Sequence, residues 1–194
     1  MTTASILVSE GPPPPSRGVV GMVCLIIAES AIFGMFIAAY VFYMGKSLSG
    51  PTPAILSPPI FNTVCLLASS LTIVFAERAI VRGKMRRFSI FLIVTILLGV
   101  KFLVGTAREW GDLIYNQHLT ISTNLFGTTF YSLVGLHATH VILGLMMLSI
   151  LLIFTLTGRV NEGHSERIKV LAMYWHFVDW VWVAVFTTVY LVGR

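Results

Sequence analysis

The sequence predicts an all-α membrane protein, a bundle of five transmembrane helices, and three observations support this fold class. Hydrophobic residues make up 56% of the 194 residues and charged residues only 11%, whereas a typical soluble domain is about 25% charged. The hydrophobic residues form long continuous runs rather than alternating patterns, which favours helices. A helix needs about 20 apolar residues to cross the hydrocarbon layer, and five segments reach that length.

Each predicted helix is bounded by a polar or helix-breaking connection. Glycines and prolines separate the first two helices at 45–59, basic residues separate the next pair at 77–87, and polar residues with aromatic neighbours follow at 108–124. A charged stretch at 158–169 precedes the last helix. The predicted helices are 19–43, 60–81, 88–107, 126–156 and 171–192, within a single domain of residues 18–194. Residues 1–17 contain four consecutive prolines, and we expect them to form a flexible arm.

The basic residues predict the orientation of the bundle. Nine lie on the side of the N-terminus and of the second and fourth connections, namely Arg17, Arg78, Arg82, Lys84, Arg86, Arg87, Arg159, Arg167 and Lys169. The opposite side carries Lys46, Arg108 and Arg194. The positive-inside rule therefore predicts a multi-pass membrane protein with a cytoplasmic N-terminus and a C-terminus on the outer side. Arg78 and Arg159 are candidate contacts for lipid headgroups. Despite the net charge of +5, this clustering argues against nucleic acid as a partner.

The inventory of metal and cofactor ligands is small. The chain has five histidines, of which His118 and His164 lie in predicted connections. The three others could not supply the axial ligands of two haems together with a copper site. Phosphate-binding loops, dinucleotide fingerprints and nucleophile elbows are absent from the sequence. We therefore expect no catalytic residue, metal site or cofactor in this chain.

Six acidic, lysine or histidine residues lie well inside the predicted spans, away from their ends, where such groups are costly and usually face the bundle interior, a partner or water. They are Glu29, Lys101, His137, His140, His176 and Asp179. Because burial disfavours the ionised form, we expect Glu29 to be neutral if it is unpaired. Glu29 is either a proton-linked or lipid-contacting acid, or a structural acid bonded to a neighbouring helix. Lys101 lies at a similar depth, and either pairs with Glu29 or extends towards the outer surface.

Two pairs of these residues have the spacing of one helix face. His137 and His140 are three residues apart and could share a metal ion. No third ligand is near in sequence, so hydrogen bonding between helices is the preferred interpretation. His176 and Asp179 have the same spacing, and we predict a polar clasp between helices, with contact to lipid headgroups or a partner subunit as the alternative. Expected polar partners on the second helix are Asn62, Ser69 and Ser70.

Three segments that hold these polar residues resemble subunit III of the haem-copper terminal oxidases. They are GMVCLIIAESAIFGMFIAAY (21–40), FGTTFYSLVGLHATHVILG (126–144) and YWHFVDWVW (174–182). FNTVCLLASS (61–70) is also similar to the family, and the resemblance spans about residues 18–193. It implies a subunit without haem or copper, both of which are expected in partner subunits. It also implies packing against subunit I, with subunits II and IV as further partners.

The resemblance implies a supporting role in oxygen reduction. Such subunits bind phospholipid in a cleft, sustain proton uptake and protect the oxidase during turnover. It carries Glu29, His137, His140, His176 and Asp179 over as the intramembrane polar set of the family, with no catalytic role established. Longer members of the family have seven helices, whereas this chain has five predicted helices. Five-helix forms occur among bacterial cytochrome c and quinol oxidases, so the resemblance implies a bacterial plasma membrane with the C-terminus on its periplasmic side.

Three other functions remain open at this point. Val178 in the last motif favours cytochrome c oxidase over quinol oxidase, whose subunit III more often has leucine there. An accessory subunit of nitric oxide reductase would share the fold. An independent proton-coupled transporter could use Glu29 and Lys101, although the sequence lacks the inverted repeats and paired broken helices of many transporters.

Overall fold

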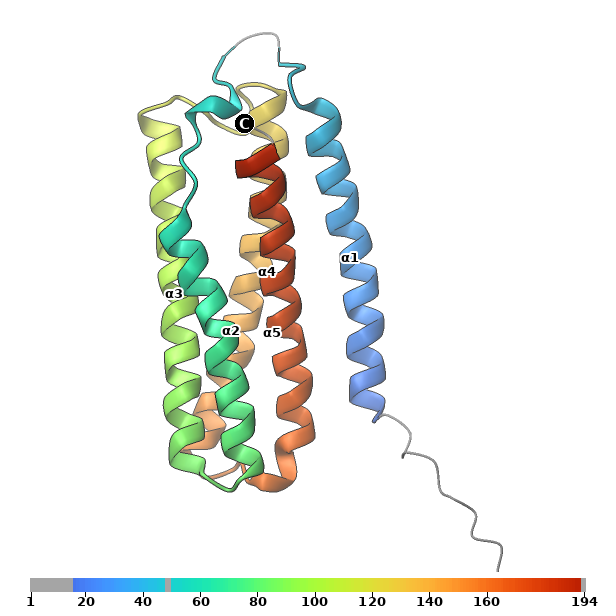
Figure 1. Ribbon diagram of the computed structural model, residues 1–194, viewed down its shortest axis with the longest axis vertical. Coiled ribbons are helices and arrows are strands. Elements are labelled where there is room, and N and C mark those ends of the chain that lie inside the picture. The colour runs from blue at the N-terminus through green and yellow to red at the C-terminus, as the bar shows by residue number, and fades with distance from the viewer. Residues whose placement is uncertain (1–15, 48–49, 193–194) are drawn as a thin grey trace, which may run out of the picture.

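The computed structural model describes residues 16–47 and 50–192, and five long helices dominate this part of the chain (Figure 1). They are α1 (Arg17–Tyr43), α2 (Ile60–Val81), α3 (Met85–Tyr115), α4 (Leu125–Leu156) and α5 (Ser165–Phe186). Short 3₁₀ turns occupy Pro53–Ile55 and Glu162–His164, and α5 continues into a π-helical end at Thr187–Val192. The described residues contain no strand. All five helices are long and apolar enough to cross a membrane, which confirms the predicted fold class.

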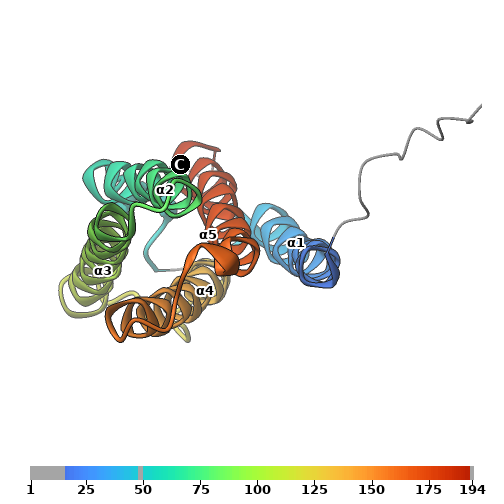
Figure 2. The same cartoon turned by 90° about the horizontal axis from the view of Figure 1, so that it is seen from below.

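Four of the helices form a closed ring, and the fifth lies outside it. Contacts join α2 to α3, α3 to α4, α4 to α5 and α5 back to α2. Figure 2 shows this ring end-on, with α1 set apart and leaning against α4 and α5. The interior of the ring is filled by aromatic side chains that are almost fully buried, among them Phe88, Phe102, Phe130, Trp175 and Trp182. By contrast, α1 buries only Phe33 and Tyr40.

All the helices except α2, which matches its predicted run, begin earlier or end later than the apolar runs that predicted them. The third was predicted at 88–107, but α3 continues to Tyr115, because a helix need not end where the hydrocarbon ends. Its polar extension is held by contacts: the ring of Trp110 lies 5.4 Å from that of Tyr131, and Glu109 accepts a 2.6 Å hydrogen bond from the Tyr190 hydroxyl. The predicted arm at 1–17 falls largely outside the described residues, and Arg17 is the first residue of α1.

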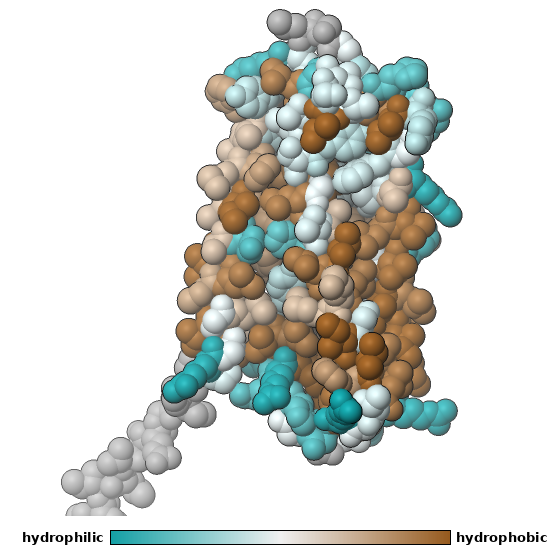
Figure 3. Space-filling view, turned by 180° about the vertical axis from the view of Figure 1, so that it is seen from behind, coloured by the Kyte–Doolittle hydropathy of each residue, from teal (hydrophilic) through white to brown (hydrophobic). Residues whose placement is uncertain are grey.

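The two ends of the bundle differ from its middle. The start of α1, the α2–α3 turn and the α4–α5 connection lie together at the lower end in Figure 1, so the nine basic residues named above gather there. In the space-filling view of Figure 3, apolar side chains form a broad band between hydrophilic ends, and a few hydrophilic side chains interrupt it. This is the surface of a multi-pass membrane protein. Which end faces the cytoplasm stays a prediction.

Trp175 is the centre of a close packing of three helices. Its indole nitrogen donates a 2.9 Å hydrogen bond to the Ser69 hydroxyl of α2. Two glycines face its ring from the other helices. A Cβ atom added to Gly99 of α3 would lie 2.9 Å from Trp175 Cη2, and one added to Gly144 of α4 would lie 2.8 Å from Trp175 Cε3. The absence of side chains at these positions lets three helices close around one indole.

Candidate functional site

Glu29 and His140 link α1 to the ring. His140 Nε2 lies 3.2 Å from Glu29 Oε2, and His140 Nδ1 lies 2.8 Å from the Leu136 carbonyl oxygen. Since a carbonyl oxygen only accepts, Nδ1 carries a hydrogen, and one further proton is shared between Nε2 and the carboxyl group. The ring of Phe33 packs edge-on against the imidazole at 5.0 Å. Glu29 therefore bonds a neighbouring helix, and it forms no ion pair with Lys101.

Replacing Glu29 tests whether this contact holds α1 in place. An amide can still bond His140 Nε2, so we expect Glu29→Gln to leave the free energy of unfolding nearly unchanged. Glu29→Leu leaves the imidazole nitrogen without a partner and should lower the free energy of unfolding by about 1–2 kcal/mol. Ser30→Ala is the matched control, because Ser30 is exposed and bonds only the Ile26 carbonyl of its own helix. Equal stabilities of the Gln and Leu variants in detergent would show that the contact is unimportant.

His176 and Asp179 meet at a serine of α2 rather than at each other. Ser70 Oγ lies 3.0 Å from His176 Nδ1 and donates a hydrogen bond to Asp179 Oδ2. Asp179 is 3% exposed, and its other oxygen, Oδ1, is buried without a partner in the described part of the chain. The predicted clasp thus exists between α5 and α2. Ser70 was expected to bond another helix, but only the fold shows which residues it joins.

The His137 imidazole points away from His140. It is fully buried, stacks on Trp182 with ring centroids 4.8 Å apart, and lies edge-on to Phe102 at 5.7 Å. Neither of its nitrogens has a hydrogen-bond partner among the described residues. With aromatic rings around His137 and a carboxyl group beside His140, the two imidazoles do not converge on one metal. Across residues 16–47 and 50–192, no three His, Cys, Asp or Glu side chains are grouped as metal ligands.

Lys101 lies apart from the other intramembrane polar groups. Its ammonium nitrogen is 5.2 Å from the centre of the Phe61 ring of α2, which is within the range of a cation–π contact. The side chain is half-buried. No ion pair with an acid is found for it among the described residues. The structure therefore gives no support to a Glu29–Lys101 pair of the kind a transporter would need.

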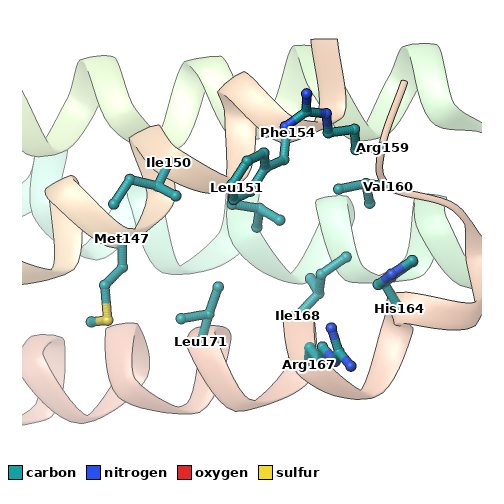
Figure 4. A pocket seen from close by; sticks show the side chains of 10 residues that line it. All are labelled: Met147, Ile150, Leu151, Phe154, Arg159, Val160, His164, Arg167, Ile168 and Leu171. Atoms are coloured by element: carbon teal, nitrogen blue, oxygen red, sulfur yellow. The ribbon is translucent and has the colours of Figure 1, made fainter. Parts of the chain in front are cut away.

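A pocket of about 470 Å³ lies between the end of α4 and the start of α5. Its walls are apolar, with Met147, Ile150, Phe154, Ile168 and Leu171 among the lining residues. Figure 4 shows Arg159, His164 and Arg167 gathered at one end, while Met147 and Leu171 lie at the other. An apolar cavity with cations at its mouth suits a molecule with an acyl chain and an anionic head.

The sequence identified only part of this pocket. Arg159 was a candidate for headgroup contact, whereas His164 and Arg167 were not. The sequence did contain an indication of them, because His164 and Arg167 lie in the same short charged connection as Arg159. This connection joins α4 to α5 and therefore keeps the three residues close together. Arg78, the other candidate, is an exposed residue of α2 and is not among the residues that line this pocket.

Comparison with known proteins gives one consistent result. The family model for cytochrome c oxidase subunit III matches residues 16–194. Cytochrome c oxidase subunit 3 of Alkalihalophilus pseudofirmus is 35% identical over 168 residues, which cover 85% of this chain and 82% of that protein. The protein of the same name from Thermostichus vulcanus is 31% identical, with 98% and 94% covered. That from Oryctolagus cuniculus is 32% identical, with 89% and 69% covered.

Proposed function

The chain belongs to the cytochrome c oxidase subunit III family, and we propose that it acts as a non-catalytic subunit of a cytochrome c oxidase. In this role it packs on the haem-binding subunit I, beside subunits II and IV, and supports proton uptake and stability during oxygen reduction. The ligand inventory supports a non-catalytic role. Among the described residues, His137 is the one buried histidine whose two nitrogens both lack a partner, and it is enclosed by Trp182 and Phe102, so the buried residues present do not fit a haem or copper centre.

Purification of the complex tests this assignment. The tagged chain, extracted in mild detergent, is expected to bring down a large haem-binding subunit with the absorption spectrum of a haem-copper oxidase. Removing the chain should leave initial oxygen reduction in place and shorten the time for which the oxidase stays active. A chain that purifies without any haem protein would contradict the assignment. A partner that oxidises quinol or reduces nitric oxide would change the assignment to another complex of the same superfamily.

The pocket between α4 and α5 supports phospholipid binding by this subunit. Its cavity offers apolar walls for an acyl chain, while Arg159 and Arg167 offer cations and His164 an imidazole for a phosphate at one end. The basic end also holds the N-terminal end of α1, so the positive-inside rule predicts that this end of the pocket faces the cytoplasmic leaflet. The anionic lipids of that leaflet match the charge of the mouth.

Charge removal at the pocket mouth should reduce bound lipid. Each basic residue near an anionic membrane surface contributes about 1 kcal/mol, so Arg159→Gln should weaken retention of anionic phospholipid about fivefold, as measured by mass spectrometry of the purified complex. Arg78→Gln serves as the control, because it removes the same charge at the same end but outside the pocket lining. Equal lipid loss in both variants would show general surface attraction rather than a lipid site.

A further inference from the structure

A second groove lies halfway along the bundle, on the face formed by α2 and α5. It has a volume of about 250 Å³. Leu67, Leu71 and Val74 of α2 and Trp180 and Val183 of α5 are among the residues that line it. The cluster of Ser70, His176 and Asp179 lines the same groove. This groove is distinct from the lipid pocket at the end of α4.

The hydrogen bonds inside this cluster leave defined groups unused. The single Ser70 hydroxyl hydrogen goes to Asp179 Oδ2, so the Ser70 oxygen accepts from His176 Nδ1. A neutral His176 therefore presents Nε2 as an acceptor. Within the described part of the chain, His176 Nε2, Asp179 Oδ1 and the Trp180 indole nitrogen have no hydrogen-bond partner. Two acceptors and one donor thus stand together without partners.

The depth of the groove excludes water and headgroups as ordinary partners. The membrane-spanning segment Ser165–Val192 has 28 residues and is about 42 Å long at 1.5 Å per residue. Asp179 lies about 21 Å from its start, near the centre of a hydrocarbon layer whose surfaces are roughly 15 Å away. Lipid tails offer no hydrogen bonds there, and an unsatisfied polar group costs several kcal/mol.

Trp180 gives a second, independent indication. It is 74% exposed at a depth where tryptophan is unusual, since tryptophans of membrane proteins concentrate at the two interfaces. Tryptophan is also enriched at the centres of protein–protein interfaces, where its large ring fills a partner's surface. An exposed indole beside unpaired acceptors therefore indicates protein on this face rather than lipid.

We propose that the α2–α5 groove is the docking site for a transmembrane helix of another oxidase subunit. The partner helix presents a hydroxyl, amide or indole donor to Asp179 Oδ1 and packs against Trp180. This inference rests on the proposed function, because it requires a membrane-embedded partner, and it adds the surface and the chemistry of the contact. It predicts that the partner has a polar side chain at the centre of one of its apolar spans.

Site-specific photo-cross-linking in the assembled oxidase tests the proposal. A photoreactive phenylalanine analogue at position 180 is expected to give a covalent product with another polypeptide of the complex. The matched control is position 97, because Leu97 of α3 is 62% exposed at a similar height on another face. The yield of cross-linked subunit at position 180 should exceed the yield at position 97 about tenfold, a ratio that corresponds to about 1.4 kcal/mol.

The outcomes separate this inference from the function on which it rests. If the chain purifies with the oxidase but position 180 captures only lipid, or captures no more subunit than position 97, the docking site is wrong and the function stands. If no haem protein accompanies the chain, both are wrong.

A blocking variant provides a second measurement. Val183→Trp fills the groove from its rim and should weaken retention of the chain by the oxidase about tenfold. Leu97→Trp should leave retention unchanged. Because Val183 is only half-buried, the isolated Val183→Trp chain is expected to keep its own thermal unfolding temperature. Undiminished retention of Val183→Trp would overturn the proposal.

Discussion

Replacing Trp175 with alanine is expected to lower the free energy of unfolding by about 3 kcal/mol, the lower end of the range for truncating a buried tryptophan. The lower end applies because the apolar side chains of this bundle lie outside water in any case. The loss of stability therefore comes from missing packing contacts and not from transfer of the side chain into water. Trp175 is fully buried, and its removal opens a cavity that Gly99 and Gly144 cannot fill. The Ser69 hydroxyl also loses its indole donor.

Thermal or denaturant unfolding of the purified chain in detergent measures this effect. Trp180→Ala is the matched control, because it removes the same side chain from the same helix at a site that is 74% exposed. It should change the stability of the isolated chain little. If the two variants unfold alike, Trp175 is not the packing centre of the ring.

Gly144→Ala is expected to destabilise the isolated chain by up to about 2 kcal/mol. Forcing one extra carbon into a packed core costs about 1–3 kcal/mol, and alanine recovers part of this because it favours a helix by about 1 kcal/mol over glycine. The added Cβ would lie 2.8 Å from Trp175 Cε3 and 3.3 Å from Tyr174 Cε1. The indole cannot easily move away, because it is bonded to Ser69 and faces Gly99 on its other edge.

A double-mutant cycle identifies the cause of the Gly144 effect. Once Trp175 is alanine, the added methyl group no longer meets the indole and keeps only the 3.3 Å contact with Tyr174 Cε1, so Gly144→Ala should become nearly neutral or stabilising in that background. Gly34→Ala in α1 is the control, because nothing lies within 4 Å of an added Cβ there, and it should be neutral or slightly stabilising. Additive effects of Gly144→Ala and Trp175→Ala would show that the two positions do not interact.

The sequence was a good guide to the helices and a partial guide to the polar sites. Apolar run length located all five spans, but it ended the third at 107, whereas α3 reaches Tyr115. Hydrocarbon thickness sets the length of an apolar run, while contacts such as Trp110 with Tyr131 decide how far the helix continues beyond it. The three-residue spacing of His137 and His140 suggested a shared face, yet their side chains separate towards Trp182 and Glu29.

The sequence by itself determined the membrane-spanning, all-helical character of this protein, its scarcity of cofactor ligands and the set of intramembrane polar residues. These properties depend on composition and on distances along one helix, which are present in the order of residues. Only the tertiary structure decided that His176 and Asp179 meet at Ser70, that Glu29 bonds His140 rather than Lys101, and that Arg167 joins Arg159 at a pocket. Each of these contacts joins different helices, and their relative positions follow from side-chain packing, such as the closure of glycines on Trp175, which no local pattern specifies.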